Sequence, residues 1–440
     1  MTTVLRAACL IDGTGRPPLP DPAIVVEGGR IKSVLGGGDT PGPGLSGPGV
    51  DVLEFPGKTV LPGMIDAHVH LVFDPALKDR EKIRVRVLEE SDTRLALRAL
   101  RNAQTALRAG VTTLRDCGDR GFVTLAVRDA IADGLVVGPR LLVSGPPITT
   151  TAGHLHYMGF QADSPEEIRR ATRVLIGAGV DSLKIMATGG MMTRGTNPST
   201  SQYTVEELRA AVDEAHRVGR RVVAHAHGTP GIRNAVRAGV DTIAHCKWQA
   251  EVSGRDYEPR LRKELSLGSH WWKPAVRDLD LAVIEEMIER GINVDLTFSG
   301  VRRTLIPHDG MKAEEQESCR AQLRELHHHY RVVKEAGVKV IVSSDAGPGG
   351  TKFEDFALGP MGVVEAGIMD AMEALVAVTR LPAEAVGLED EVGTVEPGKC
   401  ADLVVVDGDP LEDLRSLRRV EFVMLAGRPV ISGGTTVSVR

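Results

Sequence analysis

The sequence predicts an α/β fold, a (β/α)8 TIM barrel joined to a small β-sandwich domain that is built from both chain ends. Three observations predict this fold. The middle of the chain alternates short apolar runs with amphipathic stretches, which is the pattern of parallel strands connected by helices. Both chain ends are rich in short strand-like segments. Aromatic residues make up only 3% of the 440 residues, so small aliphatic side chains must form most of the core.

Eight apolar runs in residues 61–390 are the expected barrel strands. They are TVLPGMIDAHVHL, VTTLRD, PRLLVSG, SLKIMATGG, RVVAHAHG, DTIAHC, INVDLTFS and KVIVSSDAG. Stretches such as SPEEIRRATRVLIGAG and TVEELRAAVDEAHRVG lie between them, beginning with Ser or Thr and ending in Gly as helix capping favours. Eight strands, each followed by a helix, match a (β/α)8 barrel, and this region is long enough for one.

The small domain is expected to combine residues 1–60 with residues 391–440. Segments such as AIVVEGG near the start and DLVVVDGDP near the end alternate apolar residues with turn residues. Because both ends are strand-rich and flank a different middle, we expect them to meet in one small β domain.

Composition excludes several classes of function. A net charge of -6 gives no basic footprint for nucleic acid. No run of eighteen apolar residues and no signal peptide pattern is present, so no membrane partner and a cytoplasmic location are expected. Five cysteines without CxxC spacing argue against a disulfide framework or a thiolate zinc site.

Polar residues fall where the predicted strands end. They are His68 and His70 on the first strand, Lys184 on the fourth, His225 and His227 on the fifth, His245 on the sixth and Asp345 on the eighth. In a barrel these ends share the face that carries the active site. Residues at i and i+2 of a strand project from the same face, so His68 and His70 aim at one point. Histidines and a carboxylate favour zinc, with manganese, cobalt or iron as alternatives.

Lys184 has two interpretations. An ammonium group cannot ligate a metal, but a neutral buried amine can take up carbon dioxide and become a carbamate whose oxygens bridge two metals. The other interpretation is a lysine paired with a carboxylate inside the barrel mouth. The residues alone leave both open.

These motifs resemble the amidohydrolase superfamily of metal-dependent hydrolases over nearly the whole chain. The branch they resemble most is the prolidase-like one, with Xaa-Pro and Xaa-Arg dipeptidases, and imidazolonepropionases are related to it. The resemblance implies that His68, His70 and Asp345 hold one divalent ion and that His225 and His245 hold the other. It also implies that Lys184, carrying carbon dioxide as a carbamate, bridges the two ions together with a hydroxide.

Further roles follow for the remaining polar residues. Two neighbouring metal ions lower the pKa of a shared water and polarise the scissile carbonyl, and Asp345 is the candidate acid/base that passes the proton to the leaving amine. His154, in the TxGH-like loop after the third strand, is the candidate oxyanion donor. His227 and Arg194 are candidate substrate contacts, Arg194 through a bidentate contact to a carboxylate. Trp271, in the long segment 246–274, is expected to line an apolar pocket or to pack a subunit interface.

The expected activity is hydrolysis of an amide bond by a binuclear metal centre, with dipeptides or N-acyl amino acids as substrates. Two alternatives remain at this stage. The same centre could hydrolyse carbamate, urea or lactone-type xenobiotics, or the chain could be an inactive scaffold, which the filled ligand positions disfavour. Relatives of this kind are often homo-oligomers, and the same is expected here.

Overall fold

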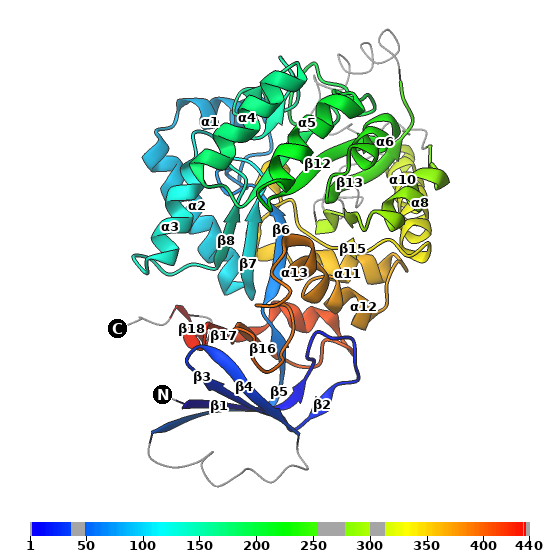
Figure 1. Ribbon diagram of the computed structural model, residues 1–440. Coiled ribbons are helices and arrows are strands. Elements are labelled where there is room, and N and C mark those ends of the chain that lie inside the picture. Colours follow the sequence, from blue (N-terminus) through cyan, green and yellow to red (C-terminus); the bar gives the residue numbers. More distant parts are fainter. Residues whose placement is uncertain (1, 37–48, 253–277, 300–312, 434, 437–440) are drawn as a thin grey trace.

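The structure is a computed structural model that describes residues 2–36, 49–252, 278–299, 313–433 and 435–436. It combines one large β sheet formed by the chain ends with a larger α/β unit in which helices surround parallel strands (Figure 1). None of the helices in these ranges has the length and apolar character needed to cross a membrane.

The two chain ends share a single nine-stranded sheet, the lower part of Figure 1. Val60 of one end pairs with Val405 of the other in an antiparallel ladder. The expected β-sandwich is not confirmed, because the strands form one continuous sheet. Their order is β19 (Thr435–Thr436), β18 (Arg428–Ser432), β17 (Val420–Leu425), β16 (Leu403–Asp407), β5 (Val50–Pro62), β1 (Thr2–Leu10), β3 (Ala23–Glu27) and β4 (Arg30–Leu35), with β2 (Leu19–Pro20) beside β1.

All eight predicted barrel strands are present, but they lie in two parallel sheets rather than one closed ring. One sheet contains β6 (Met64–Val69), β7 (Val111–Asp116) and β8 (Arg140–Val143). The other, in order, contains β10 (Phe160–Gln161), β9 (Ile148–Thr149), β11 (Ser182–Met186), β12 (Arg221–Gly228), β13 (Thr242–Gln249), β14 (Asn293–Asp295) and β15 (Val340–Ile341). Apart from β8 and β10, these strands are buried along both faces over nearly their whole length, as parallel strands covered by helices are.

Isolated backbone hydrogen bonds cross the two seams between these sheets. At one seam the backbone N–H of Asp181 donates to the carbonyl of Val143 at 2.8 Å. At the other, the N–H of Asp345 donates to His68 and the N–H of His70 donates to Ala346, both at 2.9 Å. The predicted closed ring is therefore not confirmed: isolated contacts, not a continuous ladder, cross the seams.

The helices begin and end with the expected caps. Ser164 caps α4 and a left-handed Gly179 ends it, while Thr204 and Glu207 form a capping box on α5. The helices are α1 (Arg80–Glu89), α2 (Asp92–Arg108), α3 (Val123–Ala132), α4 (Pro165–Ala178), α5 (Val205–His216), α6 (Thr229–Ala238), α8 (Leu281–Glu289), α10 (Ala313–Glu335), α11 (Leu358–Glu365), α12 (Ala371–Val376) and α13 (Arg380–Val386). Short 3-10 turns are η1 (Pro348–Gly350), η2 (Phe353–Asp355) and η3 (Leu414–Arg418). The apolar faces of the α-helices pack with the strands into one main hydrophobic core.

Candidate metal centre

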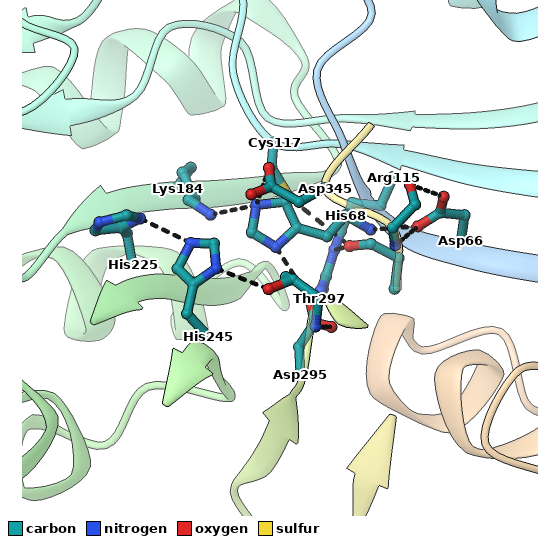
Figure 2. Close-up of polar contacts among 12 residues, drawn as sticks. Asp66, His68, Arg115, Cys117, Lys184, His225, His245, Asp295, Thr297 and Asp345 are labelled. Carbon is teal, nitrogen blue, oxygen red and sulfur yellow. Dashed lines mark hydrogen bonds and ion pairs between the residues drawn. The ribbon is translucent and has the colours of Figure 1, made fainter. Parts of the chain in front are cut away.

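The six predicted metal ligands come together at the carboxyl ends of the parallel strands, and Figure 2 shows all of them except His70. Their side chains are buried, apart from a partly exposed Asp345. They form two groups of donor atoms with Lys184 in contact with one of them.

The first group consists of His68, His70 and Asp345, whose donor atoms all lie within 4.8 Å of one another. The Oδ1 atom of Asp345 is 3.5 Å from Nε2 of His70 and 3.9 Å from Nε2 of His68. The HxH spacing therefore places both rings toward one point, as the alternation of a strand requires.

The second group consists of His225, His227 and His245, again with donor atoms within 4.8 Å. Nδ1 of His225 lies 2.9 Å from Nε2 of His245. His227 stacks on His245 with ring centroids 4.6 Å apart and planes inclined by 19°. Sequence reasoning assigned His227 to the substrate, and the structure places its ring among the donors of this second group.

Lys184 is a fully buried amine whose Nζ atom lies 3.0 Å from Nε2 of His68. Burial lowers its pKa from 10.5. No carboxylate of the described residues lies within ion-pair distance of Nζ, which disfavours a lysine simply paired with an acid. The positive charge of Lys184 contributes to the lowered pKa of both His70 and His225, so the amine acts on both groups.

The histidines of the site are held in the neutral form that binds metals. Burial is the main cause of the lowered pKa at His68, His225 and His245, and it lowers the pKa of His70 to about 3. In contrast, burial raises the pKa of Asp345 to about 7, although two lysines oppose the shift.

His154 lies in the loop after β9 with its ring 4.5 Å from that of His225. Burial lowers its pKa to about 3, and its Nδ1 atom is buried without a hydrogen-bond partner among the described residues. The ring rests on the loop after β11, where a Cβ on Gly190 would come within 2.4 Å of its Nε2. Gly190, the last residue of KIMATGG, therefore makes room for His154.

The other two predicted substrate contacts are not part of the described site. Arg194 is exposed on the loop after β11, and its charge acts on Glu81 of α1. Trp271 lies outside the described residues. A different cation, Lys247, is buried two residues after His245. Its charge opposes the rise in the pKa of Asp345 that burial causes.

Sequence reasoning missed the residues that support the ligands. Asp66, two residues before His68, accepts the backbone N–H groups of His68 at 3.3 Å and Ser344 at 3.1 Å, so it ties β6 to the segment that carries Asp345. Asp295 contacts His68 and Thr297 contacts His245 (Figure 2). The signal for this pair was a second polar i, i+2 spacing at the end of an apolar run, in VDLTFS.

Neutral imidazoles, a carboxylate and a buried amine at the carboxyl ends of parallel strands define a class of protein, the metal-dependent α/β hydrolases. The chain belongs to the amidohydrolase family, whose model matches residues 59–430. It is therefore a hydrolase of carbon–nitrogen bonds, as the sequence predicts.

Comparison with individual proteins gives the same branch as the motifs. The chain is 30% identical to the ochratoxinase of Aspergillus niger, across 96% of this chain and 84% of that protein. Among solved structures it is similar to a Xaa-Pro dipeptidase with bound methionine in its active site, with 28% identity and a TM-score of 0.79 over 98% of this chain and 99% of the other. A putative prolidase from Bifidobacterium longum is 30% identical with a TM-score of 0.78, over 99% and 96% of the two chains. The predicted resemblance to the prolidase-like branch is confirmed.

Proposed function

We propose that this protein is a binuclear metal-dependent hydrolase that cleaves the amide bond of dipeptides or N-acyl amino acids. The observation that carries the proposal is the position of Lys184, a buried amine in contact with one histidine group and electrostatically coupled to the other. The similarity to a Xaa-Pro dipeptidase and a putative prolidase supports the choice of substrate class.

The donor set fits two divalent ions, for which zinc is the expected identity. His68, His70 and Asp345 would hold one ion, and His225 and His245 the other, with His227 as a further donor of the second group. A carbamate on Lys184 would replace a buried cation by an anion between the two groups. It would thereby remove the free-energy cost of burying a positively charged amine beside metal ions. When bound, such ions polarise a carbonyl and lower the pKa of water toward neutrality.

Two residues of the chain are assigned to proton and hydrogen-bond chemistry. Asp345 would accept the proton of the attacking water through one oxygen and pass it to the leaving amine. His154 would donate a hydrogen bond to the carbonyl oxygen as charge develops there. Its lowered pKa supports this role, because a neutral ring keeps one N–H to donate without carrying a charge.

A dipeptide or N-acyl amino acid also needs a cation for its carboxylate. Arg194 was the candidate from the sequence, but its exposed position makes Lys247 the better one. Lys247 is buried at the same strand end as His245, and its charge acts on Asp345. Lys247→Met should raise the KM of a dipeptide far more than the KM of the same dipeptide with an amidated C-terminus. An equal KM change for both would show that Lys247 does not bind the carboxylate.

The same proposal includes the domain architecture. We infer that residues 61–390 form a closed eight-stranded barrel and that residues 1–60 and 391–440 form the small β domain. The hydrogen bonds across both seams and the pairing of β5 with β16 support this division. Homo-oligomer formation and a cytoplasmic location stay predictions.

The test is a screen of the zinc-loaded enzyme, supplied with bicarbonate, against a library of dipeptides and N-acyl amino acids. Lys184→Ala is the background control, and two equivalents of bound zinc are expected for the wild type. Acetate or propionate should partly restore Lys184→Ala, because a small carboxylate fits the space that the side chain leaves. Two bound zinc ions without turnover of any library member would favour carbamates, ureas or lactones. Less than half an equivalent of zinc would favour the inactive scaffold.

A further inference from the structure

The seventh barrel strand supplies no predicted metal ligand, yet it contacts a ligand in each of the two groups. From this geometry we infer that Asp295 and Thr297, at the end of β14, are positioning residues that fix the ring orientation and tautomer of His68 and His245. The inference rests on the proposed binuclear centre and adds the element that orients one ligand of each ion.

Asp295 is fully buried, and its Oδ2 atom lies 3.0 Å from Nδ1 of His68. The carboxylate is also anchored by the backbone N–H of Thr297, which donates to Oδ1 at 3.2 Å. In the inferred arrangement the Nδ1–H of His68 donates to this carboxylate, which serves as the acceptor. Nε2, the atom that faces Lys184 and Asp345, is then left with its lone pair for a metal.

Thr297 does the same for the second group. Its Oγ1 atom lies 2.9 Å from Nδ1 of His245, and both residues are buried. In the inferred arrangement the Nδ1–H of His245 donates to Oγ1, which leaves Nε2 of His245 free on the side that faces His225. His225 is fixed from another direction, since its Nε2 lies 3.2 Å from the carbonyl of Gly189 and its Nδ1 faces His245.

The backbone conformations of Thr297 and of its partner His245 support a functional role. Thr297 has a φ of 44° and His245 a φ of 69°, a left-handed conformation that is costly for a β-branched residue such as threonine. Strained residues of this kind persist where the surrounding structure holds them and they cluster at functional sites. The strain here places the hydroxyl against His245, two residues from the carboxylate that contacts His68.

The test measures metal affinity as well as activity. A two-step zinc titration against a competing chelator gives one dissociation constant for each ion, and His70→Ala and His225→Ala assign the two steps. Asp295→Asn can present its amide N–H to His68 and so favour the wrong tautomer. We expect Asp295→Asn to raise the dissociation constant of the step that is lost in His70→Ala by roughly 10- to 100-fold. This is the usual loss of metal affinity when a residue that orients a ligand histidine is replaced. The other step should change little.

Thr297→Val keeps the shape of the side chain and removes the hydroxyl, so it should weaken the step lost in His225→Ala. Thr297→Ser keeps the hydroxyl and should restore the affinity. If Asp295→Asn does not fold, as judged by circular dichroism, the comparison of Val with Ser at position 297 decides the inference. Suppose that the wild type binds two ions and that each variant leaves both binding steps unchanged or weakens them equally. This result would overturn the positioning role but not the proposed centre. A wild type that binds fewer than two ions would overturn the proposed centre and this inference with it.

Discussion

His154 should make the stability of the metal-free protein depend on pH. Burial, with a smaller contribution from neighbouring positive charges, lowers the pKa of this histidine from 6.5 to about 3 in the folded chain. Between these pH values the unfolded chain binds a proton at His154 that the folded chain does not bind. The free energy of unfolding therefore increases as the pH rises through this window, and stability is lost on acidification.

The size of the effect follows from the shift. One proton of difference corresponds to a slope of about 1.4 kcal/mol per pH unit, so the shift at His154 is equivalent to roughly 5 kcal/mol over the whole window. That is comparable with the total stability of many domains. Other buried histidines of the site add to the slope of the wild type, so the difference between wild type and variant isolates the contribution of His154.

The assay is urea denaturation of chelator-treated protein at several pH values between 4 and 7, for the wild type and His154→Gln. The variant should show a slope of unfolding free energy against pH that is lower by up to one proton. The same substitution at His328, which is exposed on α10, is the matched control. Parallel curves for the wild type and His154→Gln across the window would refute the assignment of a buried, neutral His154.

Three further substitutions test other contacts of the site. Gly190→Ala places a methyl group against the His154 ring and should lower kcat/KM by roughly 100-fold, the loss typical of one oxyanion donor, whereas Gly177→Ala on open helix surface should not. Lys184→Met should abolish turnover but raise the unfolding free energy of the metal-free chain by at least ~1 kcal/mol in a urea titration, because a buried amine is costlier than a thioether. Tyr330→Phe removes a buried 2.7 Å hydrogen bond to the backbone carbonyl at the end of β13, and thermal or urea unfolding should show a loss of about 1 kcal/mol.

The strands and the gathering of the candidate ligands could be predicted because their signals are local. The HxH motif at His68 and His70 fixes the direction of both rings through the two-residue period of a strand, whatever the rest of the chain does. The ends of the other strands could be matched to the same face because parallel strands in a barrel share one carboxyl edge. Caps such as Ser164 and Gly179 marked the helices between them in the same way.

The supporting residues could not be predicted, because their roles depend on which strands become neighbours. Nothing near Asp295 in the sequence indicates that it contacts His68, which lies 227 positions away. From the sequence, His227 is assigned to the substrate because other residues already fill the expected ligand positions. Its distance from those residues depends on the fold, and the structure places its ring against that of His245. The single sheet formed by the chain ends was not predicted either, since alternating apolar residues look the same in one sheet and in a sandwich.

The seam between the eighth and first strands links ring closure to the geometry of the site. Regular pairing of β15 ends at Ile341, and an isolated bridge between Val69 and Ala346 takes its place beside β6. Two backbone–backbone hydrogen bonds that cross this seam involve the candidate ligands themselves, from Asp345 to His68 and from His70 to the residue after Asp345. Asp345 also has a left-handed φ of 53°, so its side chain departs from the direction that a regular strand would give it. A local change that opened the seam would therefore displace the three candidate ligands of the proposed first ion together. For that reason we expect this ion to be lost before the fold when the seam is weakened.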